Sequence, residues 1–378
     1  MRWPLRVAAL ALALGLTACG GGGGGEGSRP STSTASSSPS ASPPPRRAPR
    51  RTGLTLRQQV GQVLVISFGG TSPPDYVRRA LREGRAAGVI LFGGNVESPA
   101  QVRALTGSLQ RASGRGALVA TDQEGGEFHI LPWAAPHEGE PAQATPAAAD
   151  GAARGAVRDL HAAGVNVTLA PVADVGRRGS ALAARTFPGA PGAVAANVGA
   201  AVRAYRAGGV AATAKHFPGL GAAAVNTDNG AATVRLTAAD LVPFKAAVAA
   251  GVPLVMVSHA VYPNLDPGRL ASQSPTVMRD LLRGRLGYRG VVVTDSMEAR
   301  AVIQRSSIEV ACERALAAGA DLLLLTGDGS FRPVSRALLA RARRDRAFRA
   351  RVADAAARVL ALKRSLGLRP PATARAAR

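Results

Sequence analysis

The sequence has almost no cysteine. Its 378 residues contain only Cys19 and Cys312, whereas secreted domains that depend on a disulfide framework carry several cysteine pairs. Cys312 falls in residues 308–318, which have the pattern of a buried helix, and a cysteine there behaves as a small apolar side chain. We therefore expect no disulfide framework and no nucleophilic role for Cys312.

Lysine is scarce as well. Only three of the 47 basic residues are lysines, so the net charge of +23 is carried by arginine. The arginines are scattered over predicted outer helices and both ends of the chain, whereas nucleic-acid binding needs a clustered basic stripe in a recognisable module. We expect no nucleic-acid partner, and only weak attraction to anionic envelope polymers.

The first 19 residues have the pattern of an export signal. A basic start precedes an apolar run, residues 7–16, which is too short to span a bilayer as a helix. Cys19 then follows Leu16-Thr17-Ala18, which resembles the bacterial lipobox whose cysteine is lipidated. We expect residues 1–19 to be a lipoprotein signal peptide, with a membrane anchor at Cys19 and an extracytoplasmic location. An ordinary secretory signal with an incidental cysteine is the alternative.

Three further segments follow the signal. Residues 20–53 are rich in Gly, Ser and Pro and end in four arginines. They cannot bury enough apolar area to offset their ordering entropy, so we expect a disordered tether. Its basic end could lie on anionic lipid headgroups or remain a solvated linker. Residues 54–366 are expected to form one folded domain, and residues 367–378 a basic tail.

Eight short apolar runs alternate with amphipathic, helix-like stretches in the folded domain. Several runs are apolar throughout, as expected for parallel strands covered on both faces. Eight strand–helix repeats in one domain predict an α/β fold, a TIM-type (β/α)₈ barrel. A doubly wound open sheet is the alternative. The runs are residues 63–68, 88–92, 117–121, 165–170, 210–214, 254–258, 291–294 and 321–325.

Charged and polar side chains follow five of these runs. In a parallel barrel the carboxyl ends of the strands form one rim, which is where active sites lie. Carboxylates and cations there suit a polyhydroxylated substrate, because both make charge-assisted hydrogen bonds to hydroxyl groups. No phosphate-binding glycine loop and no regular metal-ligand spacing is present, so we expect no metal and no cofactor. The groups are Asp122 to Glu124, Asp174 with Arg185, Lys215-His216, Ser258-His259 and Asp295 to Glu298.

Each of these residues also has a structural explanation. Asp122 or Asp295 could cap a following helix, His216 could be a hydrogen-bonded core histidine, and Asp174 could order its loop. His259 is equally open to both interpretations. Polar groups at five strand ends are much harder to explain structurally than any one of them, which favours a common site.

The chain resembles glycoside hydrolase family 3, in particular its single-domain bacterial β-N-acetylglucosaminidase (β-hexosaminidase) branch. The likeness runs from about Leu54 to Leu366 and agrees with the barrel prediction. Six segments carry it in the expected order: residues 121–126 (TDQEGG), 166–172 (NVTLAPV), 185–187 (RTF), 215–219 (KHFPG), 256–263 (MVSHAVYP) and 287–298, which end in VTDSME.

The resemblance implies roles for the rim residues. Asp295 would be the nucleophile that forms a glycosyl-enzyme intermediate, which water hydrolyses with retention of configuration. Asp122 would bind sugar hydroxyls, and Arg185, Lys215 and His216 would hold the N-acetylglucosamine ring in the −1 subsite. The implied activity is cofactor-free exo-hydrolysis of terminal β-N-acetylglucosamine from peptidoglycan fragments or envelope glycans. A β-glucosidase would keep the fold and change the sugar.

The loop after the KHFPG motif departs from this branch. The branch usually continues with His-Gly-Asp-Thr and an Asp-Ser-His triplet, whose His is the acid/base and whose Asp orients it. Here Asn226 takes the position of that Asp and Asp228 that of the His, while Leu220 and Ala222 replace polar residues. Glu127 stands where the family usually has a sugar-binding Arg, and His129 nearby could contribute.

Three interpretations of the altered loop remain. In the first, Asp228 is the general acid/base, which a carboxylic acid can be when its surroundings raise its pKa. In the second, the acid is lost, and the protein hydrolyses only substrates with good leaving groups or passes the glycosyl group to another acceptor. Glu124, Glu127 and Glu298 are the candidates for a replacement acid. In the third, the chain is a catalytically weak or inactive lipoprotein that binds amino sugars or cell-wall polymer. The presence of Asp295 argues against the third.

Overall fold

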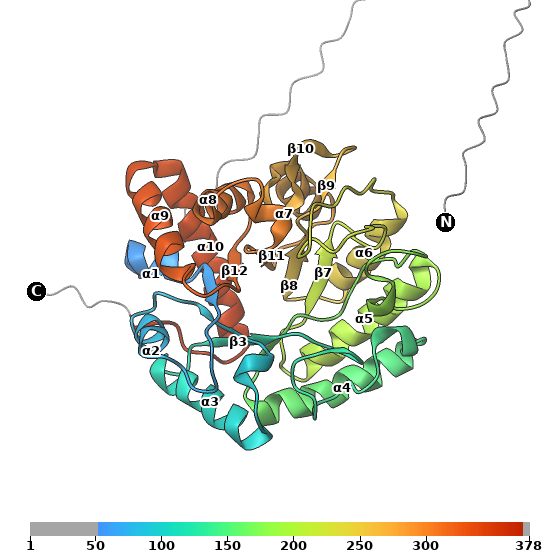
Figure 1. Ribbon diagram of the computed structural model, residues 1–378, viewed down its shortest axis with the longest axis horizontal. Coiled ribbons are helices and arrows are strands. Elements are labelled where there is room, and N and C mark those ends of the chain that lie inside the picture. The colour runs from blue at the N-terminus through green and yellow to red at the C-terminus, as the bar shows by residue number, and fades with distance from the viewer. Residues whose placement is uncertain (1–51, 373–378) are drawn as a thin grey trace, which may run out of the picture. The chain divides into compact units, whose positions relative to one another are not determined.

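The computed structural model describes residues 52–372. The predicted signal peptide with Cys19, nearly all of the tether and the end of the basic tail lie outside the described residues. Within the described part, eight parallel strands form the central sheet and helices surround it (Figure 1). The strands are β1 (Leu64–Ile66), β2 (Gly88–Leu91), β3 (Leu118–Thr121), β6 (Val167–Thr168), β7 (Thr213–Phe217), β8 (Leu254–Val257), β11 (Val291–Ser296) and β12 (Leu322–Leu325).

The sheet closes into a barrel. Neighbouring strands pair in chain order, and β1 pairs with both β2 and β12. The remaining gap, between β6 and β7, is bridged by parallel contacts of Val167 with Ala211 and of Val172 with Lys215. Backbone hydrogen bonds from Thr168 N to Ala211 O (2.9 Å) and from Thr213 N to Ala170 O (2.8 Å) complete this seam. The predicted (β/α)₈ barrel is confirmed, and the open-sheet alternative is excluded.

All eight predicted strands form, and the fifth is displaced along the chain. The apolar run at residues 210–214 placed Lys215 and His216 after the strand, but both lie within β7. Pairing continues because Phe217 aligns with Val257 of β8, and Ser258 N donates to Phe217 O at 2.9 Å. Pairing with β8 on one side and with Val172 on the other therefore keeps the backbone extended past the end of the apolar run.

Most helices begin at residues suited to that position. Ser98, Thr145, Ser307 and Asp345 each accept a hydrogen bond from the backbone N–H three residues later. Proline is the first residue of α3, α4 and α5, where its missing N–H costs nothing. The helices are α1 (Leu56–Gly61), α2 (Asp75–Arg82), α3 (Pro99–Ala112), α4 (Pro146–Ala163), α5 (Pro191–Ala207), α6 (Val242–Ala249), α7 (Arg300–Ile303), α8 (Ile308–Ala318), α9 (Phe331–Arg344) and α10 (Arg346–Ser365).

Shorter elements lie in the connections of the barrel. A wide-turn π-helix, η6 (Thr276–Arg285), precedes β11. Two small antiparallel hairpins follow β3 and β8. The hairpin strands are β4 (Gln123–Gly125) with β5 (Phe128–His129), and β9 (Val261–Tyr262) with β10 (Asp266–Leu270); the 3₁₀ turns are η1 (Gly93–Asn95), η2 (Glu140–Ala142), η3 (Ala183–Arg185), η4 (Ala239–Leu241) and η5 (Ala271–Gln273).

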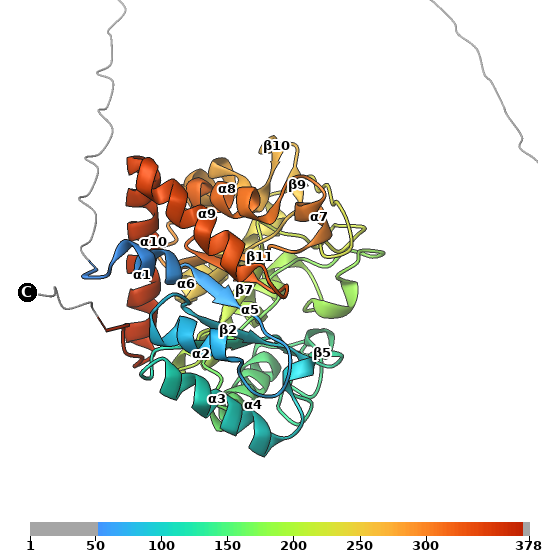
Figure 2. The same cartoon turned by 60° about the vertical axis from the view of Figure 1, so that its left-hand side comes forward.

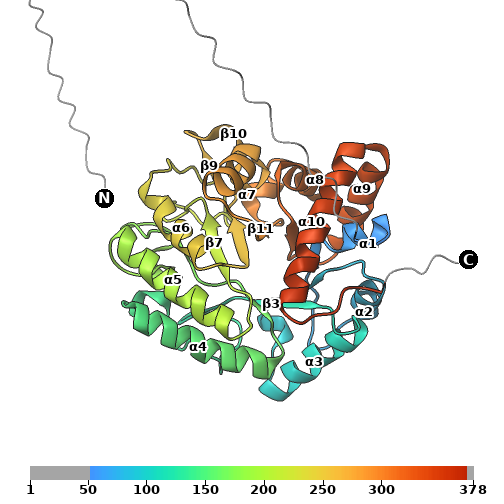
Figure 3. The ribbon, with the colours of Figure 1, turned by 180° about the vertical axis from the view of Figure 1, so that it is seen from behind.

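The strands bury side chains on both faces. Alternate residues, such as Leu322 and Leu324, fill the barrel interior, whereas Leu323 and Leu325 pack outward against the helices. Val359 and Leu362 of α10 belong to the same buried cluster as the interior residues. Helix α10 therefore packs onto the barrel interior, and Figure 3 shows it in front of the strands when the molecule is seen from behind.

The N-terminal helix joins the last two helices. Helix α1 contacts both α9 and α10 (Figure 2). Cys312 is buried in α8, as its apolar neighbourhood predicted, and is a free thiol among residues 52–372. None of the helices in residues 52–372 combines the length and the hydropathy that a bilayer crossing requires.

Candidate active site

Four charged side chains meet at the rim beyond β3 and β7. Lys215 Nζ lies 2.6 Å from Asp122 Oδ1 and 2.6 Å from Glu124 Oε1. The Arg185 guanidinium donates twice to Glu124, from Nε to Oε2 at 2.9 Å and from Nη2 to Oε1 at 2.6 Å, and it lies 5.0 Å from the centre of the Phe128 ring. We call these four residues, Asp122, Glu124, Arg185 and Lys215, the rim network. Two carboxylates and two cations balance one another in it.

Burial and pairing fix the protonation of this network. Burial alone would raise the pKa of Glu124, but Lys215 and Arg185 outweigh it and lower that pKa to about 2. Burial opposes the charged form of Lys215 too, yet Asp122 and Glu124 raise its pKa above the ordinary value. The Asp122 side chain is 30% exposed and those of Lys215 and Glu124 only 2% and 3%. Asp122 is therefore the member of the network most open to a ligand.

His216 is held by a carboxylate behind it. Asp174 is fully buried, and its Oδ2 accepts hydrogen bonds from His216 Nδ1 at 2.8 Å and from His216 N at 3.1 Å. Its Oδ1 accepts from Leu220 N at 2.5 Å. Because a carboxylate only accepts, His216 carries a proton on Nδ1, and Nε2 is the nitrogen left for other contacts. Asp174 thus orders its loop and orients His216.

Asp295, near the end of β11, is kept ionised. Burial raises the pKa of an isolated carboxyl, but His216, His259 and the N–H of Ser296, which donates to Oδ1 at 2.8 Å, lower the pKa of Asp295 below its ordinary value. His259 Nε2 donates to Ser296 O at 2.8 Å, and its Nδ1 lies 2.7 Å from Ser272 Oγ. Burial lowers the pKa of His259. His259 therefore holds the Asp295–Ser296 turn through the hydrogen bond from Nε2 to Ser296 O.

The altered loop brings Asp228 to the same place. Its backbone is fixed to α7, since Arg300 N donates to Asp228 O at 3.2 Å and Ala301 N to Thr227 O at 3.1 Å. Neighbouring protein atoms exclude part of the water from the Asp228 carboxyl, although the residue stays open to solvent. That exclusion and the negative charge of Asp295 raise the pKa of Asp228 to about 6. Two carboxyls with opposite pKa shifts therefore face one site.

The other carboxyls considered as replacement acids are placed less well. Glu124 is locked in the rim network as an anion. Glu127 is exposed at the tip of the β4–β5 hairpin. Glu298 Oε2 accepts a hydrogen bond from Thr326 N at 2.8 Å. His129 Nδ1 contacts the carbonyl oxygen of Gly126 within its own turn. Asp228 is the carboxyl here that combines access to solvent with a raised pKa.

Sequence reasoning missed Glu140, the first residue of η2. It is buried beside Glu124, and its Oε1 accepts from Val172 N at 2.8 Å. It lies in a long connection between β5 and α4 that has no periodic pattern. No group of three or more His, Cys, Asp or Glu side chains in residues 52–372 is arranged to hold a metal ion.

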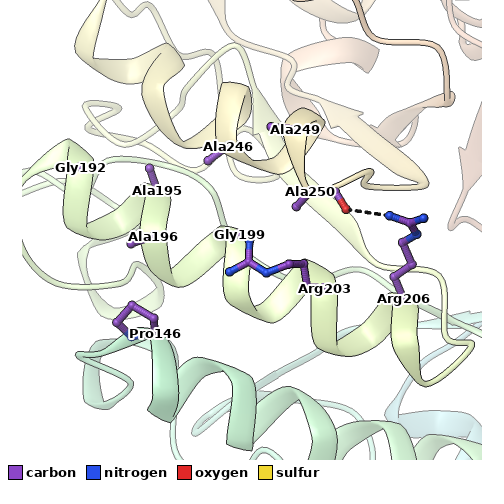
Figure 4. Close-up of a pocket in the computed structure, with 10 residues that line it drawn as sticks. All are labelled: Pro146, Gly192, Ala195, Ala196, Gly199, Arg203, Arg206, Ala246, Ala249 and Ala250. Carbon is purple, nitrogen blue, oxygen red and sulfur yellow. Dashed lines mark hydrogen bonds between the residues drawn. The ribbon is translucent and has the colours of Figure 1, made fainter.

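A separate groove of about 570 Å³ lies on the outer helices, away from the rim (Figure 4). Small side chains of α5 and α6 form most of it, and Arg203 and Arg206 border it. None of the residues described above lines it. The groove is therefore no part of this site.

Comparison with known proteins identifies the fold's relatives. The sequence profile described as the glycosyl hydrolase family 3 N-terminal domain matches residues 55–362. A β-hexosaminidase of Stenotrophomonas maltophilia (strain R551-3) is 37% identical over 279 residues, which cover 70% of this chain and 83% of that protein.

Solved structures agree. A family 3 β-N-acetylglucosaminidase from Paenibacillus sp. str. FPU-7 is 33% identical with a TM-score of 0.79; the match covers 83% of this chain and 63% of that one. A β-N-acetylhexosaminidase from Beutenbergia cavernae is 34% identical with a TM-score of 0.77, and the match covers 82% of this chain and 98% of that one. Sequence and structure together show that this chain belongs to glycoside hydrolase family 3.

Proposed function

We propose that the chain is a retaining exo-glycosidase that removes terminal β-N-acetylglucosamine from peptidoglycan fragments or related envelope glycans. The family, and relatives named β-hexosaminidase and β-N-acetylglucosaminidase, support the reaction and the sugar. The observation that carries the proposal is the pair of carboxyls with opposite shifts, because the pKa of Asp295 is lowered and that of Asp228 is raised to about 6. A nucleophile must be ionised and a general acid protonated.

The reaction then has two steps. Asp295 attacks the anomeric carbon and forms a glycosyl-enzyme bond, while Asp228 gives its proton to the departing glycosidic oxygen. Asp228, now ionised, takes a proton from the water that attacks the same carbon, and Asp295 leaves. Asp122, Arg185, Lys215 and His216 bind the sugar in the −1 subsite. The Lys215–Asp122 contact, and the hydrogen bonds of Arg185 to Glu124 and of His216 to Asp174, keep them in place before the substrate arrives.

The location of the enzyme is part of the proposal. Lipidation at Cys19 would anchor it to the outer face of the membrane, and residues 20–53 would let the barrel reach envelope glycans. Membership of the single-domain branch is supported by the Beutenbergia cavernae structure, 98% of which is covered by this chain. The curated relatives do not favour a non-catalytic amino-sugar-binding lipoprotein.

Proton NMR of an N-acetylglucosamine disaccharide during hydrolysis tests the proposal. We expect the β-anomer of N-acetylglucosamine to appear first, and no product with Asp295→Ala. Binding of N-acetylglucosamine should survive that substitution. The corresponding glucoside is the control for the sugar. Release of the α-anomer first, or equal turnover of the glucoside, would contradict the proposal, and absence of turnover together with retained binding would favour the binding lipoprotein.

A further inference from the structure

Glu140 is a deeply buried carboxyl beside the rim network that the proposed reaction does not use. Glu140 is only 3% exposed. Oε1 accepts a hydrogen bond from Val172 N at 2.8 Å, whereas Oε2 has no hydrogen-bond partner among residues 52–372. An ionised carboxylate in such a position would be a buried charge with a single hydrogen-bond donor, which is strongly unfavourable.

The charges around Glu140 are already balanced without it. Glu124 on β4, Lys215 on β7, Arg185 at the end of η3 and Tyr205 on α5 are the titratable groups that face it. Within the rim network, Lys215 and Arg185 offset Asp122 and Glu124. A third carboxylate would give this buried cluster a net negative charge and would compete for both cations. The neutral acid does not disturb that balance.

The hydrogen bond to Val172 also reaches the barrel seam. Val172 pairs with Lys215 across the gap between β6 and β7. On either side of it, Lys215 N donates to Pro171 O at 3.2 Å and Ala173 N donates to Lys215 O at 2.6 Å. Fixing Val172 therefore fixes the backbone that carries the Lys215 ammonium into the rim network.

We propose that Glu140 is a positioning residue, a neutral carboxylic acid that holds Val172 against Lys215 and leaves both cations of the rim network to Asp122 and Glu124. This inference rests on the proposed function in so far as the rim network binds the sugar. Glu140 acts through Lys215 and Arg185 and need not touch the substrate. The neutral form has the shape of a glutamine, which gives the proposal a conservative variant.

Ionisation of Glu140 should therefore weaken sugar binding at alkaline pH. Burial, reinforced by the negative charge of Glu124, raises the pKa of Glu140 well above its ordinary value. Once the proton is lost, the new anion attracts Lys215 and Arg185 away from Asp122 and Glu124. Glu140→Gln cannot ionise, so it should keep the network intact at every pH.

The first test compares kcat/KM from pH 5 to 9 for the full chain and its variants Glu140→Gln, Glu140→Ala and the exposed control Glu83→Gln. The substrate is 4-methylumbelliferyl β-N-acetylglucosaminide, whose leaving group needs little proton donation. At pH 6 we expect Glu140→Gln to stay within about threefold of wild type and Glu140→Ala to lose about 10- to 100-fold, mostly through KM. In Glu140→Gln, kcat/KM should begin to fall at a higher pH than in the wild type, whereas Glu83→Gln should fall at the same pH as the wild type.

The second test needs no turnover. The folded-state pKa of Glu140 is raised, so its contribution to stability is fully present below the unfolded-state pKa and is lost as pH rises through the folded-state pKa. In urea unfolding, Glu140→Gln should therefore gain stability relative to wild type as pH rises, and Glu83→Gln should not. A difference that does not change with pH would overturn the inference even if the enzyme is active.

The two tests distinguish failure of the proposed function from failure of the inference about Glu140. Absence of N-acetylglucosaminide turnover in the wild type would contradict the proposed function, and the urea comparison would still decide whether Glu140 is held neutral. If kcat/KM of Glu140→Gln at pH 6 is as low as that of Glu140→Ala, Glu140 does not position the network as a neutral acid. The same follows if kcat/KM of Glu140→Gln falls at the same alkaline pH as that of the wild type.

Discussion

At the scale of single residues, the neighbours of two aspartates shift their pKa values in opposite directions. Asp295 has cationic and N–H groups around it, which oppose the effect of burial. Asp228 has lost part of its water and faces the charge of Asp295, with weaker compensation from His216 and Arg185. In the proposed reaction, one residue type thus supplies both a nucleophile and an acid.

This pairing predicts the pH dependence of kcat/KM. For an unactivated disaccharide the active form has Asp295 ionised and Asp228 protonated. Activity should therefore be highest between the lowered pKa of Asp295 and a pH of about 6, and should fall about tenfold per pH unit well above that. A pH–rate profile measures this directly. A profile that is flat from pH 5 to 8 would show that no group with the pKa of Asp228 donates the proton.

At the scale of elements, helix α10 carries a buried lysine next to the barrel interior. Lys363 Nζ lies 2.8 Å from Gln62 Oε1, the residue is 1% exposed, and no carboxylate pairs with it among the described residues. Burial lowers the pKa of Lys363 to about 7. The charged form is therefore tolerated poorly in the folded protein.

The sign of the stability effect follows from that shift. Between pH 7 and the ordinary lysine pKa of 10.5 the unfolded chain binds more protons at Lys363 than the folded one. The free energy of unfolding should then rise with pH, by at most about 1.4 kcal/mol per pH unit. Urea unfolding from pH 7 to 9.5 should show this contribution as the difference in slope between the wild type and Lys363→Met, because the other titrating groups, Glu140 included, contribute equally to both.

The matched control for that prediction is Lys245→Met, because Lys245 is exposed on α6. Its slope should equal that of the wild type. Equal slopes in all three proteins would mean that Lys363 keeps its ordinary pKa, through water or a shift of α10 that brings the ammonium to solvent.

At the scale of the whole molecule, one buried carboxylate joins four parts of the fold. Asp321, just before β12, forms ion pairs with Arg283 of η6 at 2.5 Å and with Arg351 and Arg358 of α10 at 2.5 and 3.2 Å. It also accepts a hydrogen bond from Val292 N at 3.0 Å. It has no exposed surface. Its removal would take the acceptor from Arg283 Nη2 and from the Val292 N–H, and would remove a shared anion from Arg351 and Arg358.

We expect Asp321→Ala to lower the free energy of unfolding by about 3–5 kcal/mol, the cost of breaking a buried ion pair from one side. Asp354→Asn is the control, because Asp354 contacts the same Arg351 and Arg358 from a side chain that is 45% exposed. It should cost about 1 kcal/mol or less. Urea unfolding at pH 7 measures both, and comparable losses would show that Asp321 is not the central acceptor.

Much of the barrel and part of the site could be predicted from sequence because both depend on local pattern. Asp122, Lys215 and Asp295 lie at the ends of recognisable apolar runs, so the barrel topology places them together. The position of Asp228 depends instead on contacts with α7, about seventy residues later in the chain. Nothing nearby distinguishes buried Glu140 from exposed Glu127, because burial there is decided by packing of the long connection against the rim.

The measurement that bears most directly on the central claim is the response of two substrates to Asp228→Asn. For the unactivated N-acetylglucosamine disaccharide we expect kcat/KM to fall about 10²- to 10⁴-fold, because proton donation to the leaving group is lost. For 4-methylumbelliferyl β-N-acetylglucosaminide the loss should be small, and the neighbouring variant Asn229→Ala should change neither substrate. Equal losses on both substrates, or no loss on the disaccharide, would contradict the assignment of Asp228 as the general acid.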